Sequence, residues 1–336
     1  MKRPIPLFLS CLLFSVTLPA FAAELPYGKC QDIASCEPLA KKGDMEAQYN
    51  MALIYDLGEG VHKDYAKAAE WYQKAANQGL AAAQYALATL YDGGYGVKQD
   101  FKLAATWYEK AAEQGMADAQ YNLGNMYFHG DGVAQDNKKA FEWYEKSAEQ
   151  GKPRAQLGLG VLYDNGYGTK QDYGLAAQWY LKAANQGSVT AQYNIGSMYQ
   201  HGDGVQKNVD EALRWYEKAS AQGYSSAYLA MGGLYERGEG VTQDYDKARD
   251  NYIKAAELGD AEGDYCLGLL YYHGKGVKQD LVQAYAWMVT ASTLAPAEKN
   301  YNKAKNDIYS LLSADKQNEA KALANTYLIQ YGKKPE

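Results

Sequence analysis

The feature of this chain that most constrains its fold is a repeat of 36 residues. Seven copies follow one another without an insertion, so the 336 residues form a row of similar small units instead of two or three ordinary domains. Every copy has tyrosine at its ninth position, glycine at its twelfth and fourteenth, and alanine at its 22nd, counted from its first residue. The copies begin at Ala47, Ala83, Ala119, Ala155, Ala191, Ala227 and Gly263.

All six tryptophans stand at position 25 of a copy: Trp71, Trp107, Trp143, Trp179, Trp215 and Trp287. Because one aromatic residue recurs at one position in nearly every unit, we expect it to serve the packing that all units share. The sixth copy departs, with Asn251 at this position and Arg249 where the other copies carry Ala, Phe, Leu or Tyr. We therefore expect the sixth copy to pack least well.

Each copy is predicted to form a helix, a tight loop and a second helix. Apolar residues recur three and four apart up to the ninth-position tyrosine, the G-x-G motif breaks this period, and a second helical pattern follows. In the third copy we predict helices over about 119–128 and 136–149, with Asp136 at the start of the second and Gly151 in a left-handed turn after it. One such hairpin cannot bury its own apolar faces, so neighbouring hairpins must stack.

The shared pattern A-x-x-x-L-G-x-x-Y-x-x-G-x-G-V, followed by D-x-x-K-A-x-x-W-Y-x-K-A-A-x-x-G, resembles the Sel1-like repeat family, relatives of the tetratricopeptide repeats. The resemblance covers residues 47 to about 295, and the third copy, 119–151, matches it almost letter for letter. It implies an all-α fold, a right-handed α/α solenoid of seven 36-residue helix-loop-helix repeats with capping helices at both ends. It also implies a scaffold rather than an enzyme.

The two ends of the chain differ from the repeats. Residues 1–22 have the basic start, apolar run and small residues before the cut that are typical of a secretory signal peptide cleaved after Ala22, which predicts a periplasmic or secreted protein. Residues 23–46 are predicted to form an N-terminal cap with a half-repeat, and 296–336 to form C-terminal capping helices. Between them lie the repeats 47–82, 83–118, 119–154, 155–190, 191–226, 227–262 and 263–295.

Three cysteines lie outside the predicted signal peptide. Cys30 and Cys36 are candidates for one small disulfide that staples the N-terminal cap, because export leads to an oxidising compartment. Cys266 would then stay unpaired.

The charge and the mean hydropathy of the chain limit the classes of molecule that it could bind. The chain has 34 basic and 40 acidic side chains, and the predicted signal peptide contains two of the basic ones and none of the acidic ones. An acidic exported protein argues against binding to nucleic acid or anionic lipid. A mean hydropathy of −0.51 excludes a polytopic membrane protein, and we expect a monomer without a membrane span.

Positions that vary between copies are free to bind a partner. On the first helix of each unit, positions one, five, eight and nine form the packed face, and positions three, seven, ten and eleven form a neighbouring stripe that lines the concave groove in the related tetratricopeptide repeats. A row of tyrosines flanked by variable polar groups suits recognition of a protein or peptide. The alternative for the position-three tyrosines is that they only pack between helices. The candidates are Tyr49, Tyr85, Tyr121, Tyr193 and Tyr265 at position three, Asn125 at position seven, and Asp92, Phe128, His129, Asp164, Asn165, Gln200, His201, Glu236, Arg237, Tyr272 and His273 at positions ten and eleven.

No motif indicates catalysis, a metal or a cofactor. His129, His201 and His273 are two repeats apart, on the order of 20 Å if helices stack at their usual separations, which is too far for one zinc ion. The G-x-G loops follow helices and lack the third glycine of a dinucleotide site. The S-x-x-K match at 313–316 has no K-T-G or S-D-N partner.

The sequence therefore predicts an exported, non-enzymatic scaffold that binds a protein partner of unknown identity through its groove. One alternative, from the family resemblance, is an immunity protein that inhibits a lipase delivered into the periplasm. Another is a module that binds cell-wall glycan or regulates a cell-wall hydrolase, with groove tyrosines stacking on sugars.

Overall fold

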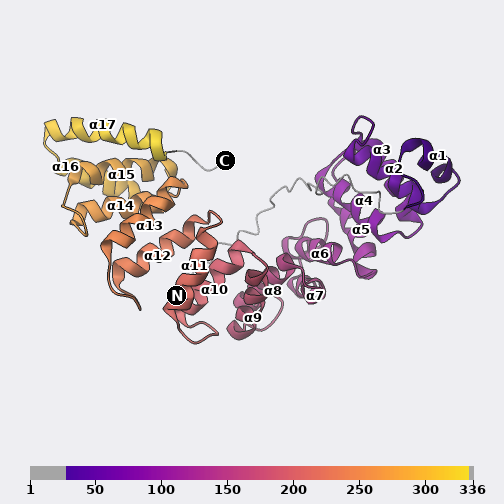
Figure 1. Ribbon diagram of the computed structural model, residues 1–336, viewed down its shortest axis with the longest axis horizontal. Helices are drawn as coiled ribbons and strands as arrows, with labels where there is room; N and C mark the ends of the chain where they lie inside the picture. Colours follow the sequence, from indigo (N-terminus) through magenta and orange to yellow (C-terminus); the bar gives the residue numbers. More distant parts are fainter. Residues whose placement is uncertain (1–27, 333–336) are drawn as a thin grey trace. The chain divides into compact units, whose positions relative to one another are not determined.

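The computed structural model describes residues 28–332, so the predicted signal peptide lies outside the described residues. Within that range the chain forms seventeen helices and no strand (Figure 1). The helices are α1 (Ile33–Lys41), α2 (Met45–Leu57), α3 (Tyr65–Asn77), α4 (Ala81–Gly93), α5 (Phe101–Glu113), α6 (Ala117–His129), α7 (Asn137–Glu149), α8 (Pro153–Asn165), α9 (Tyr173–Asn185), α10 (Val189–His201), α11 (Val209–Ser220), α12 (Ser225–Arg237), α13 (Tyr245–Glu257), α14 (Ala261–His273), α15 (Leu281–Leu294), α16 (Lys299–Leu311) and α17 (Ala314–Tyr331).

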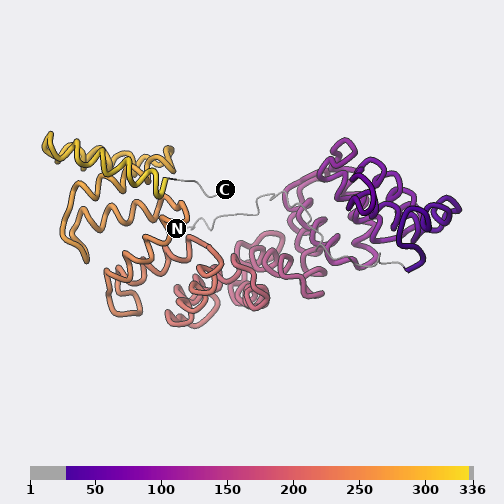
Figure 2. The backbone as a smooth tube through the Cα atoms, turned by 45° about the horizontal axis from the view of Figure 1, so that its top comes forward, coloured from indigo at the N-terminus to yellow at the C-terminus, as the bar shows by residue number. Residues whose placement is uncertain are grey.

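The helices divide into two compact units. The first reaches Ala155 and also contains Tyr167–Thr169, and the second contains Gln156–Gly166 and the chain from Lys170 onward. Within each unit the chain runs through successive hairpins (Figure 2). Each hairpin consists of the first and the second helix of one repeat copy, so the all-α repeat architecture expected from the sequence is confirmed.

Local backbone chemistry shapes each hairpin, as the third copy illustrates. Helix α6 ends at Gly130, whose φ of +82° is in the left-handed region that glycine adopts without strain. The loop is closed by the backbone N–H of Asp136, which donates to the carbonyl of Tyr127 at 2.8 Å. The Asp136 carboxylate then caps α7 by accepting from the N–H groups of Lys138 and Lys139. The predicted cap at Asp136 and left-handed turn at Gly151 are both confirmed.

The core between the two helices of a copy is built on a tyrosine that follows the tryptophan position. The tyrosine at position 26 is almost completely buried in the first six copies: Tyr72, Tyr108, Tyr144, Tyr180, Tyr216 and Tyr252. Positions five and eight of the first helix are buried in all seven copies, as the helical spacing predicts. The tyrosine at position 26 is therefore the largest core side chain that the first six copies have in common.

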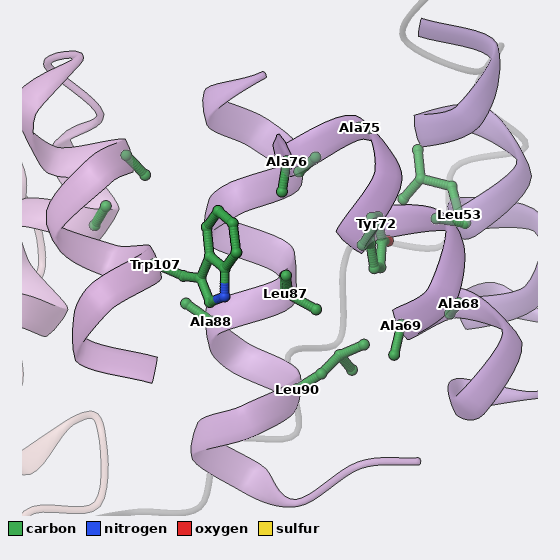
Figure 3. Packing of buried hydrophobic residues seen from close by; sticks show 14 of the residues in the cluster. Leu53, Ala68, Ala69, Tyr72, Ala75, Ala76, Leu87, Ala88, Leu90 and Trp107 are labelled. Atoms are coloured by element: carbon green, nitrogen blue, oxygen red, sulfur yellow. The ribbon is translucent and has the colours of Figure 1, made fainter. Parts of the chain in front are cut away.

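The tryptophans play a more peripheral part than the sequence suggests. Trp107, Trp215 and Trp287 are buried, but the other three are half-buried. In the first five copies a lysine three residues later places its ammonium over the indole, at 3.8 Å from the ring centroid for Lys74 over Trp71. Figure 3 shows Trp107 reaching from α5 toward Ala88 of α4, so the indole packs against the first helix of the same copy.

The glycine at position 14 sets how closely successive copies stack. A Cβ at Gly132 would overlap the backbone carbonyl of Phe101, the first residue of α5, and lie 2.7 Å from the Lys102 nitrogen. The same approach to the start of the preceding copy's second helix recurs at Gly96, Gly168 and Gly204. At Gly60 the corresponding space is open, because no full copy precedes it.

A hydrogen-bonded glutamine pair, of which one member is buried, also recurs along the repeats. In the second copy Gln84 donates to the carbonyl of Ala76 at 3.2 Å, and its side-chain oxygen accepts from Gln114 at 2.8 Å. The first and third to fifth copies contain the same glutamine pair at positions 2 and 32. The last two copies lack it: position 2 is Tyr228 in the sixth and Asp264 in the seventh.

Helices outside the seven copies pack against the first and the last copy. At the N-terminus, α1 precedes the first copy, and Cys36 is fully buried at the register of Tyr72 and bonded to Cys30. At the C-terminus, α16 packs on α15, and α17 packs along α15 instead of pairing with α16. The rings of Tyr327 and Tyr331 on α17 lie 4.3 and 4.8 Å from that of Trp287.

We expect the sixth copy to be the least protected part of the second unit in hydrogen exchange. Asn251 replaces the tryptophan and only bonds its own helix, donating to the Lys247 carbonyl at 2.8 Å, and the glutamine pair is absent. The loss of this packing should make the α13 amides exchange about tenfold faster than those of the equivalent helix α11. Equal protection of α11 and α13, measured by mass spectrometry, would contradict this.

Candidate functional site

The side chain at position ten has a structural partner that helical spacing does not reveal. In five copies the buried position-26 tyrosine donates its hydroxyl proton to the position-ten side chain of the same copy. The pairs are Tyr72 to Asp56 at 2.9 Å, Tyr108 to Asp92 at 3.3 Å, Tyr180 to Asp164 at 3.2 Å, Tyr216 to Gln200 at 2.7 Å and Tyr252 to Glu236 at 2.8 Å. The side chain at position ten therefore accepts a hydrogen bond from the core, although it belongs to the stripe of candidate binding positions.

In the other two copies the donor or the acceptor changes, and no buried tyrosine hydroxyl at position 26 is left without an acceptor. In the third copy position ten is Phe128, which has no acceptor, and Tyr144 donates to Asn125 at position seven instead. In the seventh copy position 26 is Met288, which needs no acceptor, and position ten is Tyr272. The signal was present in the sequence, because the tyrosine at position 26 recurs as regularly as the tryptophan before it.

Burial at position ten changes the acidity of its carboxyl groups. Desolvation raises the pKa of Asp56, Asp92 and Asp164 above the usual aspartate value, and the tyrosine hydroxyl opposes this rise by donating to the charged form. Burying these carboxylates therefore destabilises the folded protein, and the hydrogen bond from the tyrosine offsets part of that destabilisation.

The bond between positions 26 and ten yields a direct prediction. Tyr180→Phe should destabilise the protein by about 2 kcal/mol, because it leaves the charged Asp164 side chain buried without its donor. Tyr216→Phe should cost only about 1 kcal/mol, because Gln200 is neutral. Denaturant unfolding of both variants at neutral pH measures the difference, and equal losses would contradict the assigned role of charge.

Four of the five position-three tyrosines pack against the position-26 tyrosine of their own copy. The ring centroids of Tyr49 and Tyr72 are 5.5 Å apart, and similar contacts join Tyr85 to Tyr108, Tyr121 to Tyr144 and Tyr193 to Tyr216. Tyr265 stacks on Tyr301 of α16 at 4.6 Å. All five are half-buried, so each combines packing with a partly accessible edge.

Position eleven is the more accessible part of the stripe. His129, Asn165, Arg237 and His273 are exposed, whereas His201 is half-buried, with its Nδ1 atom 2.8 Å from the Ser197 carbonyl. The aromatic side chains at positions ten and eleven touch edge to face, with centroids 5.1 Å apart for Phe128 and His129 and 4.9 Å for Tyr272 and His273.

Stacking brings position ten of one copy beside position 13 of the next, in the middle of the G-x-G loop. We call each such pair a rung. Phe128 meets Tyr167 with ring centroids 5.9 Å apart, and Glu236 forms an ion pair with Lys275 at 3.0 Å. Asp92 is close enough to Asp131, and Asp164 to Asp203, for the second charge to raise the pKa of the first. Position 13 varies visibly along the sequence, but its place beside position ten follows only from the stacking of the copies.

Residues 28–332 contain neither a cluster of metal-ligating side chains nor a helix with the length and apolar character of a membrane span. No group of three or more His, Cys, Asp or Glu side chains in this range is arranged to hold a metal ion. Among the same residues, no helix is both long and apolar enough to cross a membrane.

Comparison with known families agrees with the repeat register. The family described as "Sel1 repeat" matches the chain seven times, at residues 46–80, 81–116, 117–152, 153–188, 189–224, 225–260 and 261–295. The chain belongs to the Sel1 repeat family. These matches account for both helices and the glycine loop of every copy in this Sel1 repeat protein. No curated protein matches the chain.

Solved structures with this fold are similar over most of the chain. A Sel1 repeat protein from Oxalobacter formigenes is 32% identical, with a TM-score of 0.60, and the match covers 67% of this chain and 98% of that one. A protective antigen of uropathogenic Escherichia coli is 28% identical, with a TM-score of 0.52, over 90% of this chain and 88% of that one. An immunity protein from Pseudomonas aeruginosa matches at 24% identity over 68% and 81% of the two chains, but a TM-score of 0.37 says nothing of a shared partner.

Proposed function

We propose that this Sel1 repeat protein is an exported, non-enzymatic scaffold that binds a protein partner along the stripe of positions three, seven, ten and eleven. The observation that carries the proposal is the contrast between the two kinds of position. The positions that pack the hairpins hardly vary between copies, whereas the exposed position eleven and the loop position 13 differ from copy to copy. A recognition surface requires exposed residues that can change while the packed residues stay the same. The specificity for a partner can then vary without loss of packing.

Export after cleavage of residues 1–22 is part of the proposal. The disulfide between Cys30 and Cys36 supports it, because such bonds persist in oxidising compartments. We further propose that residues 23–46 cap the repeats of 47–295 and that 296–336 close their other end, in a monomer. N-terminal sequencing of the protein recovered from periplasm tests the cleavage, and a start other than Ala23 would contradict it.

Capture of the mature protein from periplasm, with chemical crosslinking and mass spectrometry, tests partner binding. Because Asp92 and Asp164 hold core tyrosines, the informative variants lie at the exposed position eleven: His129→Ala, Asn165→Ala and Arg237→Ala. We expect the combined variant to lose the crosslinked partner by about tenfold or more.

The matched control makes the same kind of change on the exposed faces of the second helices, with Thr106→Ala, Lys138→Ala and Gln178→Ala. It should leave capture unchanged. Equal capture of the partner by both combined variants would contradict binding along this stripe. A single lipase in stoichiometric amount would assign the immunity role, whereas retention on peptidoglycan without a protein would favour the glycan-binding role.

A further inference from the structure

One rung contains a basic side chain that already shows how this surface binds a cation. The ammonium of Lys275, at position 13 of the seventh copy, lies 3.0 Å from one carboxylate oxygen of Glu236, at position ten of the sixth. The other oxygen of Glu236 accepts the Tyr252 hydroxyl at 2.8 Å. The buried tyrosine thus holds the carboxylate in place, and the carboxylate directs its second oxygen to a cation.

The equivalent rung between the second and third copies has the same receptor but no cation. Tyr108 donates to Asp92 at 3.3 Å, as Tyr252 does to Glu236. Asp131 stands where the seventh copy has Lys275, so a second carboxylate replaces the ammonium. Among residues 28–332, neither Asp92 nor Asp131 forms an ion pair with a basic side chain. Two neighbouring carboxylates without a counter-ion destabilise each other until a cation binds.

The flanking rungs of the first unit supply aromatic surface. On one side, Tyr95 at position 13 is 38% exposed, and its ring lies 5.5 Å from that of Tyr65. On the other side stands Tyr167, which is half-buried and packs edge to face on the buried Phe128. Aromatic faces bind the planar guanidinium of arginine and the alkyl stem of lysine, so the surroundings suit a basic side chain better than a bare ion.

We propose that the rung of Asp92 and Asp131 binds an arginine or lysine side chain of the protein partner, in the place that Lys275 occupies beside Glu236. This inference rests on the proposed function and adds the chemistry of the partner to it. The rung of Asp164 and Asp203 repeats the arrangement in the second unit, with Tyr180 in the place of Tyr108. The partner is therefore a protein whose contact surface presents basic side chains.

The test uses the full mature protein and a defined probe, the capped peptide acetyl-Gly-Arg-Gly-amide, followed by NMR. We expect arginine-dependent shifts at the backbone amides of residues 131–132 and 203–204. The peptide with citrulline, a neutral analogue of arginine, should bind at least about tenfold more weakly. Equal shifts with citrulline, or no shift at either rung, would overturn the proposal.

The variant D92N/D131N should lose the response at 131–132 and keep the response at 203–204, which is an internal control. This variant should fold, because an amide oxygen already accepts the core tyrosine at Asn125 and Gln200. In the opposite direction, Lys275→Ala should free Glu236 and create a new arginine-dependent response at the amides of 275–276. An unchanged response in either variant would contradict the assignment.

Calcium chloride at matched ionic strength separates a side-chain site from a metal site. Loss of the arginine response through calcium bound at 131–132 would overturn the proposal in favour of a divalent-cation site. If the peptide fails at both rungs but the position-eleven variants still lose the captured partner, the inference fails and the proposed function stands.

Discussion

Gly132→Ala should destabilise the protein by about 3 kcal/mol or more, a large loss for one added methyl group. At Gly132 φ is +69°, a conformation that costs alanine about 1–2 kcal/mol. The added Cβ would also overlap the Phe101 carbonyl and press on the Lys102 nitrogen, and this backbone at the start of α5 has no rotamer by which to move away. The two copies would have to separate.

Gly60→Ala is the matched control for this effect. Gly60 occupies the same position of the motif with φ of +71°, but a Cβ there meets no atom within 4 Å. It should cost only the conformational strain, about 1–2 kcal/mol. Thermal and denaturant unfolding of the two variants separates strain from lost stacking, and losses within about 0.5 kcal/mol of each other would refute the close-approach role.

Asp264→Asn should stabilise the protein by about 5 kcal/mol at pH 8 and change it little at pH 4. Asp264 replaces the buried glutamine of the amide pair, is fully buried, and has no hydrogen-bond partner for either carboxylate oxygen. Burial, with a smaller contribution from the charge of Asp260, raises its pKa to about 8. The carboxyl is therefore neutral in the folded protein near neutral pH and charged in the unfolded chain.

The direction of the pH dependence follows from proton binding. Between about pH 4 and pH 8 the folded chain holds a proton on Asp264 that the unfolded chain has released, so stability falls as pH rises through this window. The asparagine variant removes that proton and should flatten the curve of unfolding free energy against pH. Asp264→Gln restores the residue of the first five copies as a second test. Parallel pH curves for wild type and both variants would show that Asp264 is charged in the folded state.

Much of the architecture follows from short-range chemistry that the sequence displays directly. The left-handed glycine at position twelve ends each first helix, the Asp at position 18 caps the second in most copies, and both act within a few residues. The seven-fold repetition then reveals which positions the shared packing needs. The helices, loops and copy boundaries could therefore be predicted from the order of the residues alone.

The roles of individual side chains depended on contacts between distant residues. The sequence predicts that the recurring tryptophan serves the shared packing, but the tyrosine after it is the residue that is almost completely buried between the two helices of a copy. The bond from Tyr180 to Asp164 spans 16 residues, so helical spacing alone could not show that this groove candidate is also a core acceptor.

The sequence by itself determined the repeat, its two helices, its tight loop and the surface that varies. Only the tertiary structure decided which variable residues meet. Asp92 and Asp131, like Glu236 and Lys275, are 39 residues apart and belong to different copies, so their pairing depends on how closely the copies stack. That distance is fixed where a glycine at position 14 lets one backbone touch the next, a contact between units that no single unit's sequence describes.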